Sequence, residues 1–469
     1  MGDKLNVILI VCDTLRKDVL DLYGGKASTL ELRNLANKLD MEMKWFNGVS
    51  NSFWTLPSHY TLFTGLLPSE HKVHEPKDLV SFDYPRYYEE LARSYRGSMI
   101  SLEARKKGYY SIGISNNTGF VNHQFGLSRY FNEFYINPFS FSINVNQGLT
   151  DKNALLLHQL SELYNKRFTA IKELLFNKRF NTIFEATKAK LKIWINRYFN
   201  HDRIIDKGGY LTLSLIREGS VRLREPFFLF INMMECHEPY RFSKKYNFFT
   251  PEVFQQFYLG LMNINKKLLD NLKEDYIKDS EYCLGIISSI IKEISRYTKS
   301  FIAIITSDHG QEFGEHGSIS HNIGSLYEEN IGIPIIIMAP KQVIKDYIQP
   351  YYVDLIQVNN LVKSIVSSGS ISFINVQGSD YIIVSESYGA EYPSYLEGKE
   401  LQELYRQRLR VPRKAIYYRN AKVLLNEKEG KVEETLLNGK HAKESSEIKK
   451  IIDELSPFIN VGDFGKIKF

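Results

Sequence analysis

The chain has 469 residues, 43% of them hydrophobic, and 60 Lys and Arg stand against 54 Asp and Glu. This length and apolar content support a large core and exclude wholesale disorder. A net charge of +6 is small for this length and does not indicate a nucleic-acid-binding protein. Three cysteines are too few for a disulfide scaffold and favour a reducing compartment. The apolar run near the N-terminus is too short for a signal peptide or a membrane span, so we expect a cytoplasmic protein without a transmembrane segment.

Short apolar runs alternate with segments of helical spacing along the first three quarters of the chain. They predict buried strands at 6–12, 111–115, 226–233, 301–306 and 333–338, and helices at 30–39, 101–107 and 284–294. Polar clusters follow several of these strands, and open α/β sheets bind their ligands at the carboxyl ends of the strands. The alternation therefore predicts an α/β fold with a doubly wound, mostly parallel sheet flanked by helices.

Two changes in composition and residue pattern divide the chain further. Segments 168–176 and 184–198 are helical patterns rich in Lys and Arg, and they predict a helical insertion at 152–225 within a catalytic domain at 1–375. The basic face of this insertion is a solvated surface, a collar for acidic substrates or a surface for a partner. Strands at 381–385, 415–418 and 422–425 and a closing helix at 448–455 predict a small α+β C-terminal subdomain at 376–469.

The residues at the strand ends have the chemistry of metal ligands. Asp13, Asp308 and His309 offer carboxylate oxygens and an imidazole, which suit Zn, Mn or Mg. Thr55 lies two residues before Pro57, where a helix can start and where free N–H groups attract anions. A bound cation can lower the pKa of a hydroxyl and make it a nucleophile. Taken alone, Thr55 is also explained as a helix cap and Asp13 as an N-cap.

The order of these motifs is more specific than any one of them. The matching segments are 6–18 with Tyr23 and Gly24, 55–71, 237–240, 306–317, His321 with 326–335, and 352–355. Together they resemble the alkaline phosphatase / sulfatase superfamily over residues 5–360. The resemblance implies an alkaline-phosphatase-like fold in which a metal-bound nucleophile attacks sulfur or phosphorus, a covalent intermediate forms, and water releases it.

The resemblance also implies a role for each site residue. Asp13, Asp308 and His309 would hold the metal, and Thr55 would attack the ester. The other two catalytic candidates, His237 and His321, would bind the transferring group or protonate the leaving oxygen, because the pKa of imidazole is near neutrality. The substrate would be an anionic ester, either a small molecule or one linked to a glycan or lipid, and no nucleic acid is expected.

The chain departs from the sulfatase pattern at its centre. Sulfatases carry a Cys or Ser that is oxidised to formylglycine, whereas oxidation of Thr55 would give a ketone, so no formylglycine is expected. His59 replaces the family's arginine, and Asn116 and Asn117 stand where a lysine is usual, as substrate donors or as ordinary turn residues. These departures favour the branch with Thr nucleophiles, which resembles phosphodiesterases, phosphoglycerol transferases and phosphomutases.

The predicted function is therefore that of a metal-dependent hydrolase that cleaves a phosphate monoester or diester, or a sulfate ester, through Thr55. The alternatives are a phospho-group transferase of the same fold and a non-catalytic anion-binding relative. One divalent ion (Mn, Zn, Mg or Ca) is expected, and a second would use Glu235, His237 and His321. His316 is either a ligand or a loop histidine. A further set of histidines is expected to surround the site or lie on the surface: His59, His71 and His74.

Overall fold

The structure is a computed structural model that describes residues 4–74, 99–137, 206–240, 263–321, 324–341, 350–369, 381–389 and 411–442, with a few isolated positions beside them. The predicted helices at 168–176 and 184–198 lie outside the described residues, as do most of the insertion at 152–225 and most of the closing helix at 448–455.

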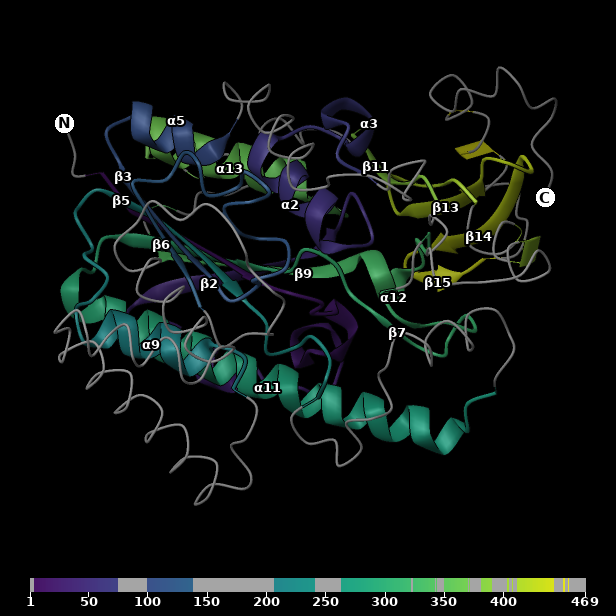
Figure 1. The fold of residues 1–469 in the computed structure, drawn as a ribbon, viewed down its shortest axis with the longest axis horizontal. Coiled ribbons are helices and arrows are strands. Elements are labelled where there is room, and N and C mark those ends of the chain that lie inside the picture. The colour runs from purple at the N-terminus through teal and green to yellow at the C-terminus, as the bar shows by residue number, and fades with distance from the viewer. Residues whose placement is uncertain are drawn as a thin grey trace, which may run out of the picture.

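An eight-stranded sheet forms the centre of the molecule (Figure 1). In spatial order its strands are β10 (Val353–Asp354), β2 (Met41–Val49), β9 (Gly332–Pro340), β6 (Phe301–Thr306), β1 (Asn6–Cys12), β5 (Phe227–Met233), β3 (Tyr110–Ser115) and β4 (Glu133–Ile136). Neighbouring strands are parallel except at β9, which is antiparallel to both β2 and β6. The mostly parallel sheet is confirmed, and each of its five predicted strands forms.

Helices cover both faces of this sheet (Figure 1). One face packs against α2 (Thr55–Thr64), α5 (Ile100–Lys106) and α13 (Leu355–Ser368), and the other against α1 (Leu30–Lys38), α9 (Gly209–Arg217) and α11 (Lys266–Tyr297). Side chains alternate along a strand, so in β1 Val7 and Leu9 join the first core and Ile8 the second. Because both faces are buried, the strands read as continuous apolar runs.

Three strands of the central sheet, β2 and the short β4 and β10, and helix α13 are not predicted by the sequence patterns. Strand β2 has only partial burial and no regular alternation, so its period-2 signal is weak. Helix α13 does carry a start signal: the Asp354 side chain accepts from the Gln357 N–H, and the Gln357 side chain accepts in return. This reciprocal capping box is readable in sequence as an acid three residues before a Gln.

Helix α11 is much longer than the predicted segment at 284–294. Its first half exposes charged residues on most sides, and the Asn265 side chain caps it by accepting from the Lys267 N–H. Despite its 32 residues, neither α11 nor any other helix in the described part of the chain is long and apolar enough to cross a membrane.

Short elements connect these layers. They are η1 (Lys17–Val19), η2 (Asp21–Tyr23), α3 (Pro68–His71), α12 (Glu328–Ile331) and the small hairpin of β7 (Glu312–Phe313) and β8 (Ile319–Ser320).

A separate antiparallel sheet lies towards the C-terminus, drawn in yellow-green in Figure 1. Its strands pair in chain order: β11 (Ile382–Ser387), β12 (Arg413–Tyr418), β13 (Ala421–Asn426), β14 (Lys431–Leu437) and β15 (Lys440–His441). The domain boundaries at 375 and 376 stay a prediction, because residues 372–380 lie outside the described part.

This second sheet holds the loop that leads into α2. Asn51 donates to the Val384 carbonyl at 2.9 Å and to the Asp354 carboxylate at 3.0 Å. Ser385 donates to the Ser50 carbonyl at 2.5 Å. The position of Thr55 therefore depends on contacts with chain more than 300 residues away.

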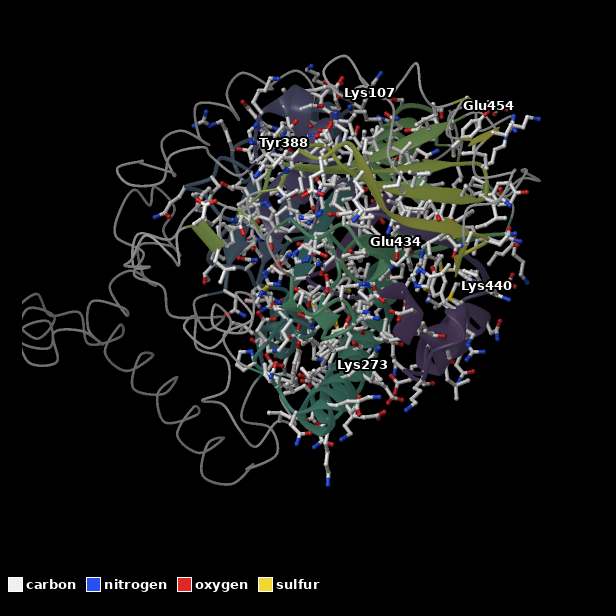
Figure 2. The ribbon with its side chains drawn as sticks, turned by 90° about the vertical axis from the view of Figure 1, so that its right-hand side faces the viewer. Lys107, Lys273, Tyr388, Glu434, Lys440 and Glu454 are labelled. Atoms are coloured by element: carbon white, nitrogen blue, oxygen red, sulfur yellow. The ribbon has the colours of Figure 1, made fainter. Side chains whose placement is uncertain are left out.

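A buried lysine binds this sheet to α12. The Lys422 side chain is 0% exposed, and its Nζ lies 2.8 Å from a Glu434 oxygen and 3.6 Å from a Glu328 oxygen. Figure 2 labels Glu434 on this sheet. We expect Lys422→Met to lower the free energy of unfolding by about 3–5 kcal/mol, because it leaves the buried Glu434 carboxylate without the lysine that neutralises it. Urea unfolding would measure this.

The matched control for that substitution is Lys431→Met, on the exposed start of β14. A surface change of this kind alters the free energy of unfolding by less than about 0.5 kcal/mol. Equal effects of the two substitutions would show that the Lys422 ion pairs do not hold the sheet in place.

Candidate active site

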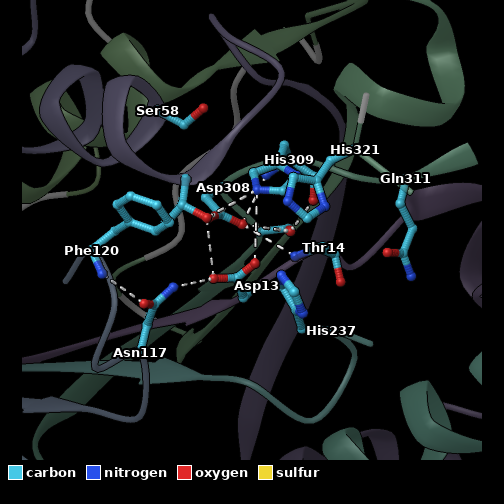
Figure 3. A network of polar contacts seen from close by, with 12 residues as sticks. Asp13, Thr14, Ser58, Asn117, Phe120, His237, Asp308, His309, Gln311 and His321 are labelled. Carbon is cyan, nitrogen blue, oxygen red and sulfur yellow. Dashed lines mark hydrogen bonds and ion pairs between the residues drawn. The ribbon is translucent and has the colours of Figure 1, made fainter. Parts of the chain in front are cut away.

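Three acidic and imidazole side chains meet at the carboxyl edge of the central sheet (Figure 3). Asp13 follows β1, and Asp308 and His309 follow β6. Their ligand atoms all lie within 4.8 Å of one another, and each side chain is 0% exposed. The register explains the meeting, because Val11 pairs with Thr306 and the two parallel strands end side by side.

The two carboxylates leave oxygens without donors. Asp13 Oδ1 and Asp308 Oδ2 are both buried and have no hydrogen-bond partner. Buried acceptors of like charge are costly unless a cation or donor faces them. With an imidazole beside them, these oxygens fit a divalent metal ion such as zinc or manganese.

His309 is held in the form that binds metal. Its Nδ1 donates to the Gly310 carbonyl at 2.8 Å, so Nε2 carries the free lone pair. Nε2 lies 3.7 Å from Asp13 Oδ1 and 3.5 Å from Asp308 Oδ2. Burial lowers the pKa of His309 to about 4 and raises the pKa of Asp308 to about 7. A cation would favour the charged carboxylate and reverse the second shift.

Thr55 is the first residue of α2 and faces the same cluster. Its Oγ1 lies 3.4 Å from Asp13 Oδ2 and 3.3 Å from His309 Nε2, and the residue is 3% exposed. The N-cap position belongs to Trp54, whose side chain makes no cap hydrogen bond. The structure thus brings Thr55 together with Asp13, Asp308 and His309, and its role as a nucleophile stays a prediction.

His237 and His321 lie beside this cluster. Their ring centroids are 5.0 Å apart, and the His321 ring lies 4.8 Å from that of His309. Figure 3 shows both rings next to Asp13 and His309. The structure groups Glu238 with these two histidines, with ligand atoms within 4.8 Å of one another.

Glu235 does not join that second group, so its suggested place in a second metal site is wrong. Strand β5 ends at Met233, so residues 235 and 237 do not share a strand face. Glu235 instead turns away and accepts from the Gly209 N–H at 2.7 Å. Sequence spacing could not reveal this, because it depends on where the strand stops.

Two further polar residues support the cluster. Asn117 donates to Asp13 Oδ2 at 2.9 Å, and its own oxygen accepts from Phe120 N–H at 2.9 Å (Figure 3). It is thus a turn residue that also holds a candidate ligand. His59 is 0% exposed, donates from Nδ1 to the Thr55 carbonyl at 2.8 Å, and lies 3.5 Å from Asp308 Oδ2.

The other suggested residues lie apart from the metal cluster. His316 contacts Glu329 at 2.9 Å and stacks on Tyr327, which makes it a loop histidine. His71 is buried against Thr61, and Asn116 accepts from Thr212. His74 stacks on Tyr388.

Comparison of the sequence with protein-family models identifies the family. The sequence model of the sulfatase family matches residues 5–367. This chain belongs to the sulfatase family. The match spans the central sheet and includes Asp13, Thr55, His237, Asp308 and His309, so the clustered residues of this sulfatase-family protein lie within the family's own domain. No curated protein sequence matches the chain.

Solved structures show the same fold at low identity. A 2-O GAG sulfatase is 14% identical with a TM-score of 0.58, over 99% of this chain and 95% of its own. The phosphonate monoester hydrolase of Agrobacterium radiobacter is 14% identical with a TM-score of 0.57, over 97% and 95%. The C-terminal periplasmic domain of EcEptC from Escherichia coli, in complex with Zn, is 13% identical with a TM-score of 0.50, over 84% and 92%. The alkaline-phosphatase-like fold is confirmed.

Proposed function

We propose that this sulfatase-family protein is a metal-dependent hydrolase of phosphorus esters, phosphate or phosphonate, that reacts through a covalent intermediate on Thr55. The observation that carries the proposal is a threonine hydroxyl 3.3–3.4 Å from two candidate metal ligands. The formylglycine of sulfatases is an aldehyde, and a threonine side chain cannot be oxidised to one. A threonine oxygen suits phosphoryl transfer, in which positioning and charge neutralisation supply most of the catalysis.

The cluster of Asp13, Asp308 and His309 would hold one divalent cation. That cation would neutralise charge on the ester oxygens and lower the pKa of the Thr55 hydroxyl. Zinc is the first ion to test, because a protein of the same fold is described in complex with Zn. Asn117 would keep Asp13 in place through its hydrogen bond to Oδ2.

The reaction would proceed in two displacements. Thr55 would release its proton to water, and its Oγ would bond to phosphorus while the bond from phosphorus to the leaving oxygen breaks. His237 or His321, close to the cluster, would take up a proton from solvent at Nε2 and give it to that oxygen. Water then attacks phosphorus, the Thr55–phosphorus bond breaks, and the hydroxyl is restored. The organic part of the ester, small or carried by a glycan or lipid, stays open.

A substrate panel tests the proposal. The full chain, loaded with zinc or with manganese, would be assayed on 4-nitrophenyl phosphate, bis(4-nitrophenyl) phosphate, 4-nitrophenyl phenylphosphonate and 4-nitrophenyl sulfate. We expect a higher kcat/KM for at least one phosphorus ester than for the sulfate. Turnover of the sulfate alone would contradict the choice of phosphorus, and absence of any turnover would favour an anion-binding relative.

A further inference from the structure

Glu238 contacts the two histidines beside the metal cluster by different routes. Its carboxylate Oε2 lies 3.6 Å from His237 Nδ1, and its own carbonyl accepts from the same Nδ1 at 2.8 Å. Its Oε1 accepts from the Ser320 hydroxyl at 2.7 Å. Ser320 Oγ in turn lies 3.1 Å from His321 Nδ1. One carboxylate is therefore linked to both rings.

The hydrogen-bonding capacity of each group determines which atoms donate and which accept in this series of contacts. A carboxylate only accepts, so the single hydroxyl proton of Ser320 points to Glu238. The Ser320 oxygen can then only accept from His321, whose Nδ1 must carry a proton. A carbonyl also only accepts, so His237 Nδ1 carries a proton as well. In both neutral rings Nε2 is left as the nitrogen with a free lone pair.

The geometry around Ser320 shows that the link is built into the fold. Ser320 is 7% exposed and has a φ of 66°, a left-handed conformation that is unfavourable for residues other than glycine. The Ser320–Glu238 hydrogen bond joins β8 to the loop after β5, 82 residues apart in the chain. Such a conformation persists where surrounding contacts hold it in place.

We propose that Glu238 is a positioning residue that sets the tautomer and orientation of His237 through its backbone carbonyl and carboxylate, and those of His321 through Ser320, so that Nε2 of each ring is the nitrogen that takes up a proton and delivers it to the ester's leaving oxygen. The proposal rests on the proposed function for its effect on catalysis, but the tautomers themselves do not depend on it. The competing role for Glu238 is that of a ligand in a second metal site with the same histidines.

Substrates with different leaving groups test the catalytic effect. In Glu238→Gln the size is kept and the charge is lost, and in Ser320→Gly the hydroxyl is lost while the backbone strain is relieved. We expect kcat for a phenyl ester to fall by about 10- to 100-fold in both variants. The matching 4-nitrophenyl ester, whose leaving oxygen needs little protonation, should lose much less, with KM little changed. Equal losses on the two esters would overturn the proposal.

A matched control uses the other Glu–His pair near the site. Glu329→Gln changes a carboxylate that contacts His316 at 2.9 Å, outside both ligand groups. It should leave the ratio of the two substrates unchanged. Metal per chain is measured in every variant: an unchanged count supports a positioning role, and loss of one ion per chain in Glu238→Gln overturns it.

The tautomers are measured without turnover, which separates this proposal from the proposed function. In protein labelled with ¹⁵N-histidine, two-bond ¹H–¹⁵N correlations distinguish Nδ1–H from Nε2–H rings, and His237→Asn and His321→Asn assign the two signals. We expect Nδ1–H for both rings in the wild type and mixed tautomers for His321 in Ser320→Gly. An Nε2–H ring at either position in the wild type would overturn the inference, even if the protein hydrolysed no ester tested.

Discussion

Replacing Thr55 with alanine should abolish ester cleavage and leave the bound metal in place. The hydroxyl is the attacking atom in the proposed reaction, and removing a catalytic nucleophile lowers kcat by about 10⁴- to 10⁶-fold. The metal should remain because Asp13, Asp308 and His309 are unchanged, and the Thr55 hydroxyl lies 3.3–3.4 Å from His309 and Asp13 without being one of the three ligands. Steady-state kinetics and metal analysis of the same sample measure both results.

Ser58 provides the control on the same helix. Its Oγ lies 3.1 Å from Ser50 Oγ, and Figure 3 shows it apart from the polar network around Asp13. Ser58→Ala should therefore keep most of the activity. Mass spectrometry after a rapid acid quench should find a phosphoryl group on Thr55 in the wild type. Full activity of Thr55→Ala would refute the nucleophile assignment.

Removing the divalent cation should have the second-largest effect. A chelator is expected to abolish activity, and added zinc or manganese to restore it, since the cation neutralises the ester oxygens and activates Thr55. A ligand that binds only the folded state also stabilises it, by about 2.7 kcal/mol when its concentration is 100 times its Kd. The melting temperature should therefore rise with zinc concentration.

Asp308→Asn assigns this effect to the cluster. It should weaken zinc binding and remove most of the zinc-dependent rise in melting temperature. Since Asp308 Oδ2 is buried without a donor, the metal-free variant should be no less stable than the metal-free wild type. Asp275→Asn, which removes an ion pair with Lys278 on α11, serves as the control and should leave zinc binding unchanged. Unaltered zinc affinity in Asp308→Asn would place the metal elsewhere.

Local sequence patterns were sufficient to predict most long strands of the central sheet. The runs at 6–12 and 301–306 become β1 and β6 with their predicted bounds, because a strand buried on both faces must be apolar throughout. The same logic predicted β5 and β9 but not the direction of β9. A run of apolar residues reports burial, and it carries no information on whether a neighbour runs parallel or antiparallel.

The candidate site also has features that the sequence predicts and features that only the folded structure shows. The chemistry of Asp13, Thr55, Asp308 and His309 is readable in the chain, because residue type and position after a strand are local properties. The distances are not, since Thr55 and His309 are 254 residues apart, and the loop that leads to Thr55 is held by hydrogen bonds to the second sheet. Tertiary structure alone decided that Asn117 holds Asp13.

The clearest case of that division is the loop after β5. The amino-acid sequence shows that a histidine and nearby acids follow this strand. Only the folded chain determined that Glu238, and not Glu235, lies with His237 and His321, because β5 stops at Met233 and the following loop turns Glu235 towards Gly209. Residue chemistry is encoded locally, whereas side-chain direction beyond a strand depends on contacts made by distant segments.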